Sequence, residues 1–319
     1  MLDLTFPTIL ELGLFSKELK IGENNYNIKR KYCRSSIISD FAILLGGSFS
    51  VTKDASGKVY GNIIGSFWLN TAREGKFCIV DNKGNITPTN PLMHHIGIRP
   101  VVRYSSIKDS ATTIKTKNSV FEKEVEFGEY PQMVVPVTLS KKLDMLFFTN
   151  DENLKKTGKA YTTNSKEIVG SLAQPFTPRK HAEYEYMREK YILFYTDETV
   201  NNKVLSNGET AEDKNGFYWI KVEPIVWYVD EANDLAISKR VLLSGISIED
   251  KLRYYGDFRN TQMKKFLDEY LSKEIICSGI KELKDNQENK KLNDIDSIFE
   301  EATNRMNEIN SRAKTKVLK

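Results

Sequence analysis

The chain has 319 residues, of which 40% are hydrophobic, enough to fill one large core or two ordinary ones. Its 47 lysines and arginines nearly balance 43 acidic residues, so the net charge is only +4. This balance excludes the global positive field of a dedicated nucleic-acid-binding protein, and any basic function must be local.

The cysteines and the first residues predict a cytoplasmic protein. Cys33, Cys78 and Cys277 are odd in number, widely spaced and form no CxxC pair, which suits a reducing compartment better than a disulfide framework. Residues 1–15 are apolar, but they contain two acids and no cationic leader, so they do not resemble a signal or transit peptide. No apolar run approaches membrane-spanning length.

The first segment, residues 1–104, is predicted to be compact and β-rich. The pattern favours a short helix over Ser36–Leu45 and strands over Lys58–Ile64 and Lys76–Val80. The polar and glycine residues of Asp81–Asn85 then predict a hairpin turn into a further strand.

A surface connection is predicted over residues 105–119, which are rich in Ser, Thr and Lys and lack an apolar period. It leads to a second, α+β segment, residues 120–280. There the turn residues Lys214–Gly216 precede a strand over Phe217–Val222, which indicates another hairpin.

The end of this second segment combines strands with a helix. A strand pair is predicted at Ile225–Val229 and Leu235–Ser238. From Phe258 onward the apolar spacing becomes helical, and we expect this helix to pack on the sheet. Its apolar face consists of Met263, Phe266, Leu267, Tyr270 and Leu271.

The third segment, residues 281–319, opens with a charged linker, Lys281–Lys291, and continues as an amphipathic helix. The apolar stripe of this helix either docks on the protein's own body or pairs with another chain, since isolated amphipathic helices are marginal. The stripe contains Leu292, Ile295, Phe299, Ala302, Met306 and Ile309, and we name Ile295, Phe299, Ala302 and Met306 as its interface residues.

Two motifs of the first segment resemble a known pattern. Gly65–Arg73, which reads GSFWLNTAR, and Gly97–Val102, which reads GIRPVV, are similar to the closing segment of an uncharacterised bacterial and phage domain family. The same pattern resembles the formylglycine-generating enzyme fold, a C-type-lectin-like relative. Asn70 stands where the uncharacterised family usually has Arg.

The second segment resembles the opening half of the same family. Val125–Gln132, Glu223–Trp227 and Leu235–Lys239 are similar to its first three strands, and Phe258–Leu271 to its first helix. The closing half therefore precedes the opening half, so the chain is either circularly permuted or carries two partial copies. The resemblance implies an α+β fold with a β-rich, C-type-lectin-like body and a C-terminal amphipathic helix.

No catalytic or metal-binding constellation is apparent. Formylglycine-generating chemistry would need a reactive cysteine pair, and none of the three cysteines falls in the matching motifs. His94 and His95 are adjacent on an extended chain, so they point to opposite faces and lack nearby ligand partners. The GxxxxGK[ST], GxSxG and HExxH motifs are absent. We expect no catalysis, no cofactor and no metal.

Two clusters are candidates for binding. The first is a basic stretch around a tyrosine, which suits contact with phosphates or nucleic acid, unless it is simply a solvated loop; it consists of Lys29, Arg30, Lys31, Tyr32 and Arg34. The second lies in the lectin-like closing motifs, where the resemblance implies a face for ligands or partners; it consists of Trp68, Asn70, Arg73, His94, His95 and Arg99. The alternative is that Trp68 belongs to the core and Arg99 to a buried pair.

The sequence thus predicts a non-catalytic binding or assembly protein, encoded by a phage or other mobile element. It would act by self-association or by binding a protein partner, with no membrane contact. Two alternatives remain open: a phage-type inhibitor or regulator of a nucleic-acid-processing complex, and a cryptic enzyme related to the formylglycine-generating fold.

Overall fold

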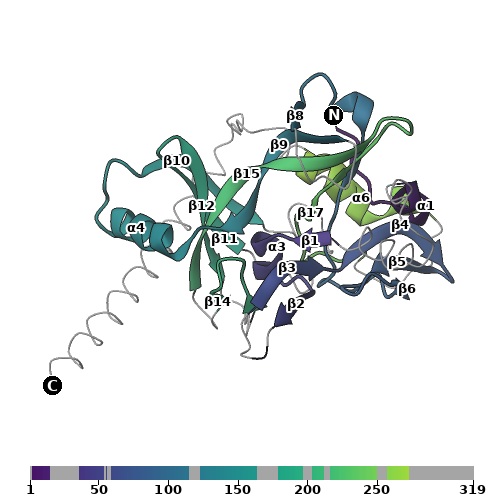
Figure 1. Ribbon diagram of the computed structural model, residues 1–319, viewed down its shortest axis with the longest axis horizontal. Coiled ribbons are helices and arrows are strands. Elements are labelled where there is room, and N and C mark those ends of the chain that lie inside the picture. Colours follow the sequence, from purple (N-terminus) through teal and green to yellow (C-terminus); the bar gives the residue numbers. More distant parts are fainter. Residues whose placement is uncertain are drawn as a thin grey trace.

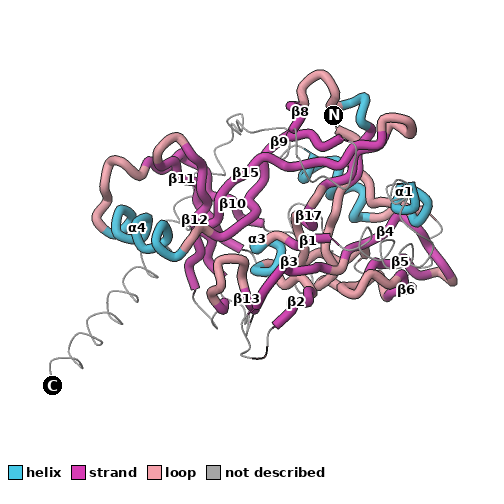
Figure 2. Tube along the Cα trace, viewed as in Figure 1, coloured by secondary structure: helices cyan, strands magenta, loops and turns pink. Residues whose placement is uncertain are grey.

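The computed structural model shows a β-rich α+β protein with several antiparallel sheets, as the sequence predicted (Figure 1). It describes residues 2–14, 36–53, 55, 59–114, 123–163, 179–196, 203–211, 216–249 and 257–272. Figure 2 shows that strands and loops make up most of these ranges. No helix within them is long and apolar enough to cross a membrane.

The largest sheet has eight strands, with β15 at its centre. One edge of β15 pairs with β9, while the other edge pairs first with β12 and then with β16. Ile225, Trp227 and Val229 are buried and alternate with more exposed residues, which is the two-residue period of a strand. The strands are β7 (Val101–Arg103), β8 (Thr112–Ile114), β9 (Lys123–Val134), β10 (Lys155–Thr163), β11 (Arg179–Tyr186), β12 (Glu189–Thr196), β15 (Gly216–Asp230) and β16 (Leu235–Ser238).

Three smaller sheets complete the strand arrangement. In the four-stranded sheet, β1 pairs in parallel with β17, so that Ile37 lies opposite Arg240, and antiparallel with β3. The smaller sheets are β17 (Arg240–Val241), β1 (Ser36–Ile38), β3 (Val59–Gly65) and β2 (Phe49–Lys53); β4 (Phe67–Arg73), β5 (Lys76–Val80) and β6 (Ile86–Thr89); and β13 (Lys203–Val204) with β14 (Thr210–Ala211).

The helices are short, and two of them, α3 and α6, begin at side-chain caps. The Ser39 hydroxyl accepts from the Ala42 amide at the start of α3, and the Thr261 hydroxyl accepts from the Lys264 amide at the start of α6. The described helical elements are α1 (Ile9–Leu14), α3 (Asp40–Leu44), η1 (Tyr104–Ser106), α4 (Val137–Phe148), η3 (Phe258–Asn260), α6 (Gln262–Phe266) and the π-helical turn η4 (Leu267–Leu271).

The segment from Gly97 to Arg103 joins three sheets. Gly97 exchanges backbone hydrogen bonds with Ser66 and Trp68 at the start of β4. Ile98 does the same with Leu242 and Leu243, which follow β17. The next residues form β7, which pairs with β16. A Cβ atom on Gly97 would lie 2.2 Å from Val241 Cγ1 and 2.8 Å from the Ser66 carbonyl oxygen. This position therefore requires glycine for close backbone approach rather than for an unusual φ.

Buried apolar side chains form two clusters. The main core draws on both halves of the chain, from Leu4 and Trp68 to Trp227 and Leu271. The second cluster lies under α4, against one face of β11, β12 and β15, and includes Leu143, Leu146, Tyr184, Tyr191 and Trp219. We call these the main core and the α4 core. Figure 1 shows α4 at one end of the molecule, away from α1 and α6.

Several local predictions are confirmed. β5 and β6 form the predicted hairpin around Asp81, and β16 pairs with the end of β15 as predicted. The predicted helix after Phe258 is present as η3, α6 and η4, with four of its predicted apolar residues buried. The two strands predicted at Phe217–Val222 and Ile225–Val229 are one strand, interrupted only by shifts in register near Pro224.

Other local predictions are wrong. The helix predicted over Ser36–Leu45 begins only at Asp40, because Ser36–Ile38 form β1 between β3 and β17. The predicted connection 105–119 contains β8, which pairs with β9. In both places pairing with distant strands overrides the local pattern. The predicted linker and helix of 281–319 lie outside the described residues.

Candidate interaction surfaces

Trp68 and Arg99, which the sequence offered as contact residues, are core residues. Their exposed fractions are 0% and 2%. Arg99 Nε donates to the Ser238 carbonyl oxygen at 2.8 Å, and its guanidinium carbon lies 5.2 Å from the centre of the Phe67 ring. Burial of a guanidinium is tolerated where hydrogen bonds and an aromatic face replace water. Neither side chain can meet a partner from this position, so the alternative of a structural role fits them.

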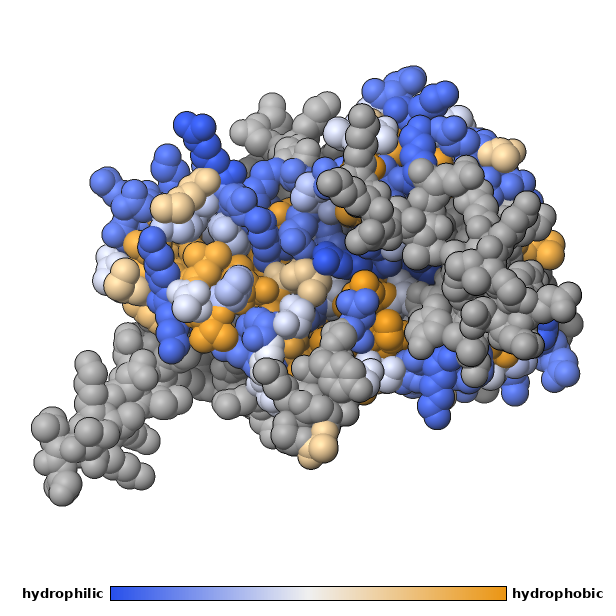
Figure 3. Space-filling model, viewed as in Figure 1, coloured by the Kyte–Doolittle hydropathy of each residue, from blue (hydrophilic) through white to orange (hydrophobic). Residues whose placement is uncertain are grey.

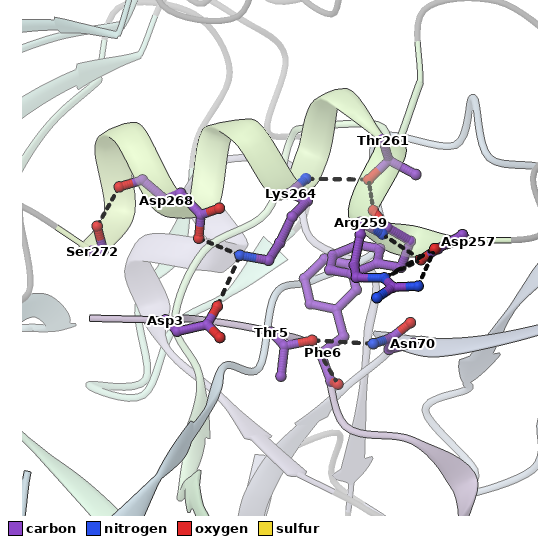
Figure 4. Close-up of polar contacts among 11 residues, drawn as sticks. Asp3, Thr5, Phe6, Asn70, Asp257, Arg259, Thr261, Lys264, Asp268 and Ser272 are labelled. Atoms are coloured by element: carbon purple, nitrogen blue, oxygen red, sulfur yellow. Dashed lines mark hydrogen bonds and ion pairs between the residues drawn. The ribbon is translucent and has the colours of Figure 1, made fainter. Parts of the chain in front are cut away.

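Asn70 fixes the N-terminal segment onto β4. Its side-chain nitrogen donates to Thr5 Oγ1 at 3.2 Å (Figure 4). Its backbone amide donates to the Pro7 carbonyl oxygen at 3.0 Å. The same view shows Lys264 Nζ between the carboxylates of Asp3, at 2.9 Å, and Asp268. These contacts join the N-terminus, β4 and α6, which gives Asn70 a structural role.

Arg73 and the histidine pair are the more exposed members of that predicted group. Arg73 is exposed and precedes the tight turn between β4 and β5, where Glu74 and Gly75 have φ angles of 52° and 71°. His94 is exposed and His95 half-buried, with ring centres 6.0 Å apart. Burial, and then the positive charges of His94 and Lys203, lower the pKa of His95. These surroundings disfavour a cation, and no metal-binding group occurs among the described residues.

The buried carboxylate of Asp40 is the strongest catalytic candidate, and its contacts are structural. Asp40 is fully buried at the start of α3 and accepts hydrogen bonds from the Val134 amide at 2.9 Å and from the Ser206 amide at 2.8 Å and the Ser206 hydroxyl. Burial raises the pKa of Asp40, although these hydrogen bonds and the charge of Arg240 oppose the rise. Ser206 lies in the loop between β13 and β14 and donates both its amide and its hydroxyl to Asp40. The carboxylate therefore fixes this loop against α3.

Two further predictions concern residues outside the described ranges. The basic stretch Lys29–Arg34 and the stripe residues Ile295, Phe299, Ala302 and Met306 lie outside the described residues.

Helix α4 carries a candidate interaction surface that the sequence analysis did not predict. Leu139, Leu143 and Leu146 lie three or four residues apart, so they share the face that packs on the sheet. The carboxylate of Asp144 accepts from Trp219 Nε1 at 2.8 Å, which ties the helix to β15. Burial raises the pKa of Asp144 despite this hydrogen bond. The apolar spacing was visible in the sequence and would have predicted the helix.

Aromatic rings pack closely beneath α4. The ring centres of Phe147 and Tyr184 lie 5.9 Å apart, those of Tyr184 and Trp219 lie 5.3 Å apart, and both pairs meet edge to face. Such pairs add about 0.5–1.5 kcal/mol beyond the burial of their area. The outer face of α4 is therefore presented on a well-packed support.

The outer face of α4 exposes large apolar side chains beside lysines. Met145 is 58% exposed and Phe148 36% exposed, one turn apart on the helix. Lys142 Nζ lies 5.3 Å from the ring centre of Tyr186, and Met187, 72% exposed, follows in the turn between β11 and β12. We call this set the α4 surface; it comprises Lys141, Lys142, Met145, Phe148 and Met187. Figure 3 shows hydrophobic atoms gathered at this end of the molecule among hydrophilic side chains.

The α4 surface differs from the other exposed apolar positions of the described chain. Two further large apolar side chains are exposed, Leu10 on α1 and Met93 in a loop. Each stands alone on its own element, and single exposed apolar residues are ordinary features of soluble proteins. The gathering on α4 therefore singles out this face.

Comparisons with protein-family models, curated proteins and solved structures found no match.

Proposed function

We propose that the protein is a non-catalytic binding or assembly protein that captures a protein partner on the α4 surface. The observation that carries the proposal is the exposed pair Met145 and Phe148 on a helix whose opposite face is held by an aromatic core. Methionine and aromatic side chains are enriched at protein interfaces, and a rigid support lowers the entropy lost on binding. The neighbouring lysines supply charge at the rim of the surface.

The finer architecture belongs to the same proposal. A lectin-like body with its two halves in swapped order is supported by one contact between the halves: β7, in the closing motif, pairs with β16, in the opening segments. A phage or mobile-element origin also remains part of the proposal. It rests on the resemblance of the closing motifs.

The proposal is tested by placing a photo-crosslinking amino acid at Met145 in the full chain, inside cells that express it. We expect covalent adducts to one defined protein, mapped by mass spectrometry of the crosslinked peptide. Leu10 is the matched control, because it is also an exposed apolar helix residue, at 82% exposure, but lies on α1. Absence of adducts at position 145, or the same adducts from both positions, would refute a specific binding role for this surface.

The two alternative functions stay predictions. A regulator of a nucleic-acid-processing complex would rely on Lys29–Arg34, and its partner binding would weaken steeply with salt. A cryptic enzyme of the formylglycine-generating type would carry stoichiometric copper, which elemental analysis detects.

A further inference from the structure

We propose that the occupant of the α4 surface is the C-terminal stripe of a second copy of this chain, residues 292–309, here called the arm. This inference rests on the proposed binding function and names the partner. It follows from three properties of the chain: matching apolar patterns, opposite charges and the reach of the intervening residues.

The apolar patterns of the two elements match. The α4 surface presents Met145 and Phe148 one turn apart, and the turn that carries Met187 follows Tyr186, whose ring Lys142 of α4 contacts. The arm has apolar residues three or four apart, including Phe299, Ala302 and Met306, so it would form a single apolar face as a helix. A helix that lays such a face on a partner helix is a recurrent mode of recognition. Methionine side chains on both elements can adapt to one another.

Opposite charges favour the same pairing. The arm contains five acidic residues and one arginine, so its net charge is −4; these residues are Asp294, Asp296, Glu300, Glu301, Glu308 and Arg305. Lys141 and Lys142 are exposed on α4, while Asp144 faces Trp219. Complementary charges accelerate association and disfavour wrong partners. The α4 surface is thus basic and apolar where the arm is acidic and apolar.

The connection between body and arm favours an arm from another copy. Nineteen residues separate Ser272 from Leu292, and a relaxed coil of that length spans roughly 30 Å. A compact body of this size is about 50 Å across. Figure 1 places α6, which precedes Ser272, away from the end that carries α4. An arm that docks on its own α4 would have to stretch this connection beyond its relaxed span, which costs chain entropy, whereas the arm of a second copy is under no such restraint.

The contact would be heterologous, because α4 of one copy meets the arm of the next. Heterologous contacts repeat from copy to copy, producing rings if the rotation closes and open chains if it does not. We therefore expect the mass of the assembly to grow with concentration beyond a dimer, unless a small ring closes.

Light scattering on the full chain across a dilution series tests this expectation. The wild-type mass should rise above that of one chain as concentration increases. Met145→Glu should reduce association at least tenfold, because it places a carboxylate among apolar groups and near the acidic arm. Leu10→Glu is the matched control and should associate as the wild type does. A wild-type chain that stays monomeric at all concentrations overturns the inference.

A mixing experiment identifies the two sides of the contact. Met145→Glu keeps its arm, and Phe299→Glu keeps its α4 surface, so each should be monomeric alone. Mixed together, they should form a complex of two chains and nothing larger, since only one functional contact remains. Both variants change side chains outside the described core, and circular dichroism checks that they fold. Monomers in the mixture would overturn the inference.

Charge reversal supplies a second readout. Reversing Lys141 and Lys142 to Glu should weaken association, and a chain with Glu300→Lys and Glu301→Lys should restore it on mixing. Absence of this rescue would contradict the charge pairing between arm and α4. If the crosslinker at position 145 captured a different protein while the chain stayed monomeric, this inference would fail and the proposed binding function would stand.

Discussion

The main core and the α4 region share one sheet but use their side chains in opposite ways. In the main core, the chain from Gly97 to Arg103 is packed so closely that even its arginine at position 99 is buried. In the α4 region, one face of the helix is equally well packed, yet the other leaves Met145 58% exposed and Phe148 36% exposed. Trp68, Asn70 and Arg99, which look functional in the sequence, thus serve packing, while an ordinary helix presents the candidate interface.

This contrast shows how chemistry-bearing residue types can mislead. Arginine, tryptophan and asparagine suggest binding when they gather in a motif, and here Arg99 and Asn70 tie segments of the chain together while Trp68 fills the core. Exposed methionine and phenylalanine attract less notice because they resemble core residues. Only the structure shows that two of them point outward.

The largest expected effect breaks the main core. Phe258 is 2% exposed and its ring centre lies 4.6 Å from that of Phe6 and 6.2 Å from that of Phe77. Phe258→Ala should lower the free energy of unfolding by about 3–5 kcal/mol, because it removes these contacts and leaves a cavity. Urea denaturation measures the loss. Met145→Ala on the α4 surface, where the side chain is 58% exposed, is the control and should change stability by no more than about 0.5 kcal/mol. Equal losses would mean that the two regions do not differ as described.

A smaller effect is expected at the segment that joins the sheets. Gly97→Ala places a methyl group 2.2 Å from Val241 Cγ1, and overpacking of this kind destabilises by about 3 kcal/mol. Gly208→Ala is the control, because its Cβ would meet nothing within 4 Å and only its φ of 85° adds strain, worth about 1 kcal/mol. Chemical denaturation of both variants compares them. A loss for Gly97→Ala that is no larger than the control would show that Val241 yields easily.

The smallest effect concerns pH and sharpens the description of α4. Burial raises the pKa of Asp144 in the folded state, so folded protein holds this proton more tightly than unfolded protein does. The contribution of Asp144 to stability should therefore improve as pH falls from neutral towards its ordinary value of 3.8. Asp144→Asn keeps an acceptor for Trp219 Nε1 but cannot titrate. We expect the free energy of unfolding of the wild type, relative to that of this variant, to rise as pH is lowered. If this difference did not change with pH, the Asp144 carboxyl would have the same pKa in the folded and unfolded protein and would not be desolvated.

Local turn chemistry made parts of the fold predictable. The hairpin of β5 and β6 follows from the Asp81 carboxylate, which accepts from the Lys83 and Asn85 amides at 2.8 Å, within a five-residue stretch of sequence. The β15–β16 pair and the helix after Phe258 carry equally local signals. Each of these depends on neighbours in sequence, which a single chain reveals.

Long-range pairing made other parts unpredictable. Ser36–Ile38 is a strand because its partners are β3 and, about 200 residues later, β17. The candidate site was hidden for a different reason, because the helical spacing in Val137–Phe148 does not say which apolar residues face the sheet. Leu146 and Phe147 turn inward while Met145 and Phe148 turn outward, and neighbouring strands decide this.

The parallel pairing of β1 with β17 has a consequence for synthesis of the chain. Ile37 leaves the ribosome about 200 residues before Arg240, its partner, and at ordinary elongation rates this delay is on the order of 10 s or more. During that time the edge of β1 that pairs with β17 is unpaired. The edge of β7 that pairs with β16 is also unpaired until β16 has been synthesised. Unpaired strand edges favour association with other chains. Slower translation or a higher density of ribosomes on one message should therefore increase aggregation of the nascent protein.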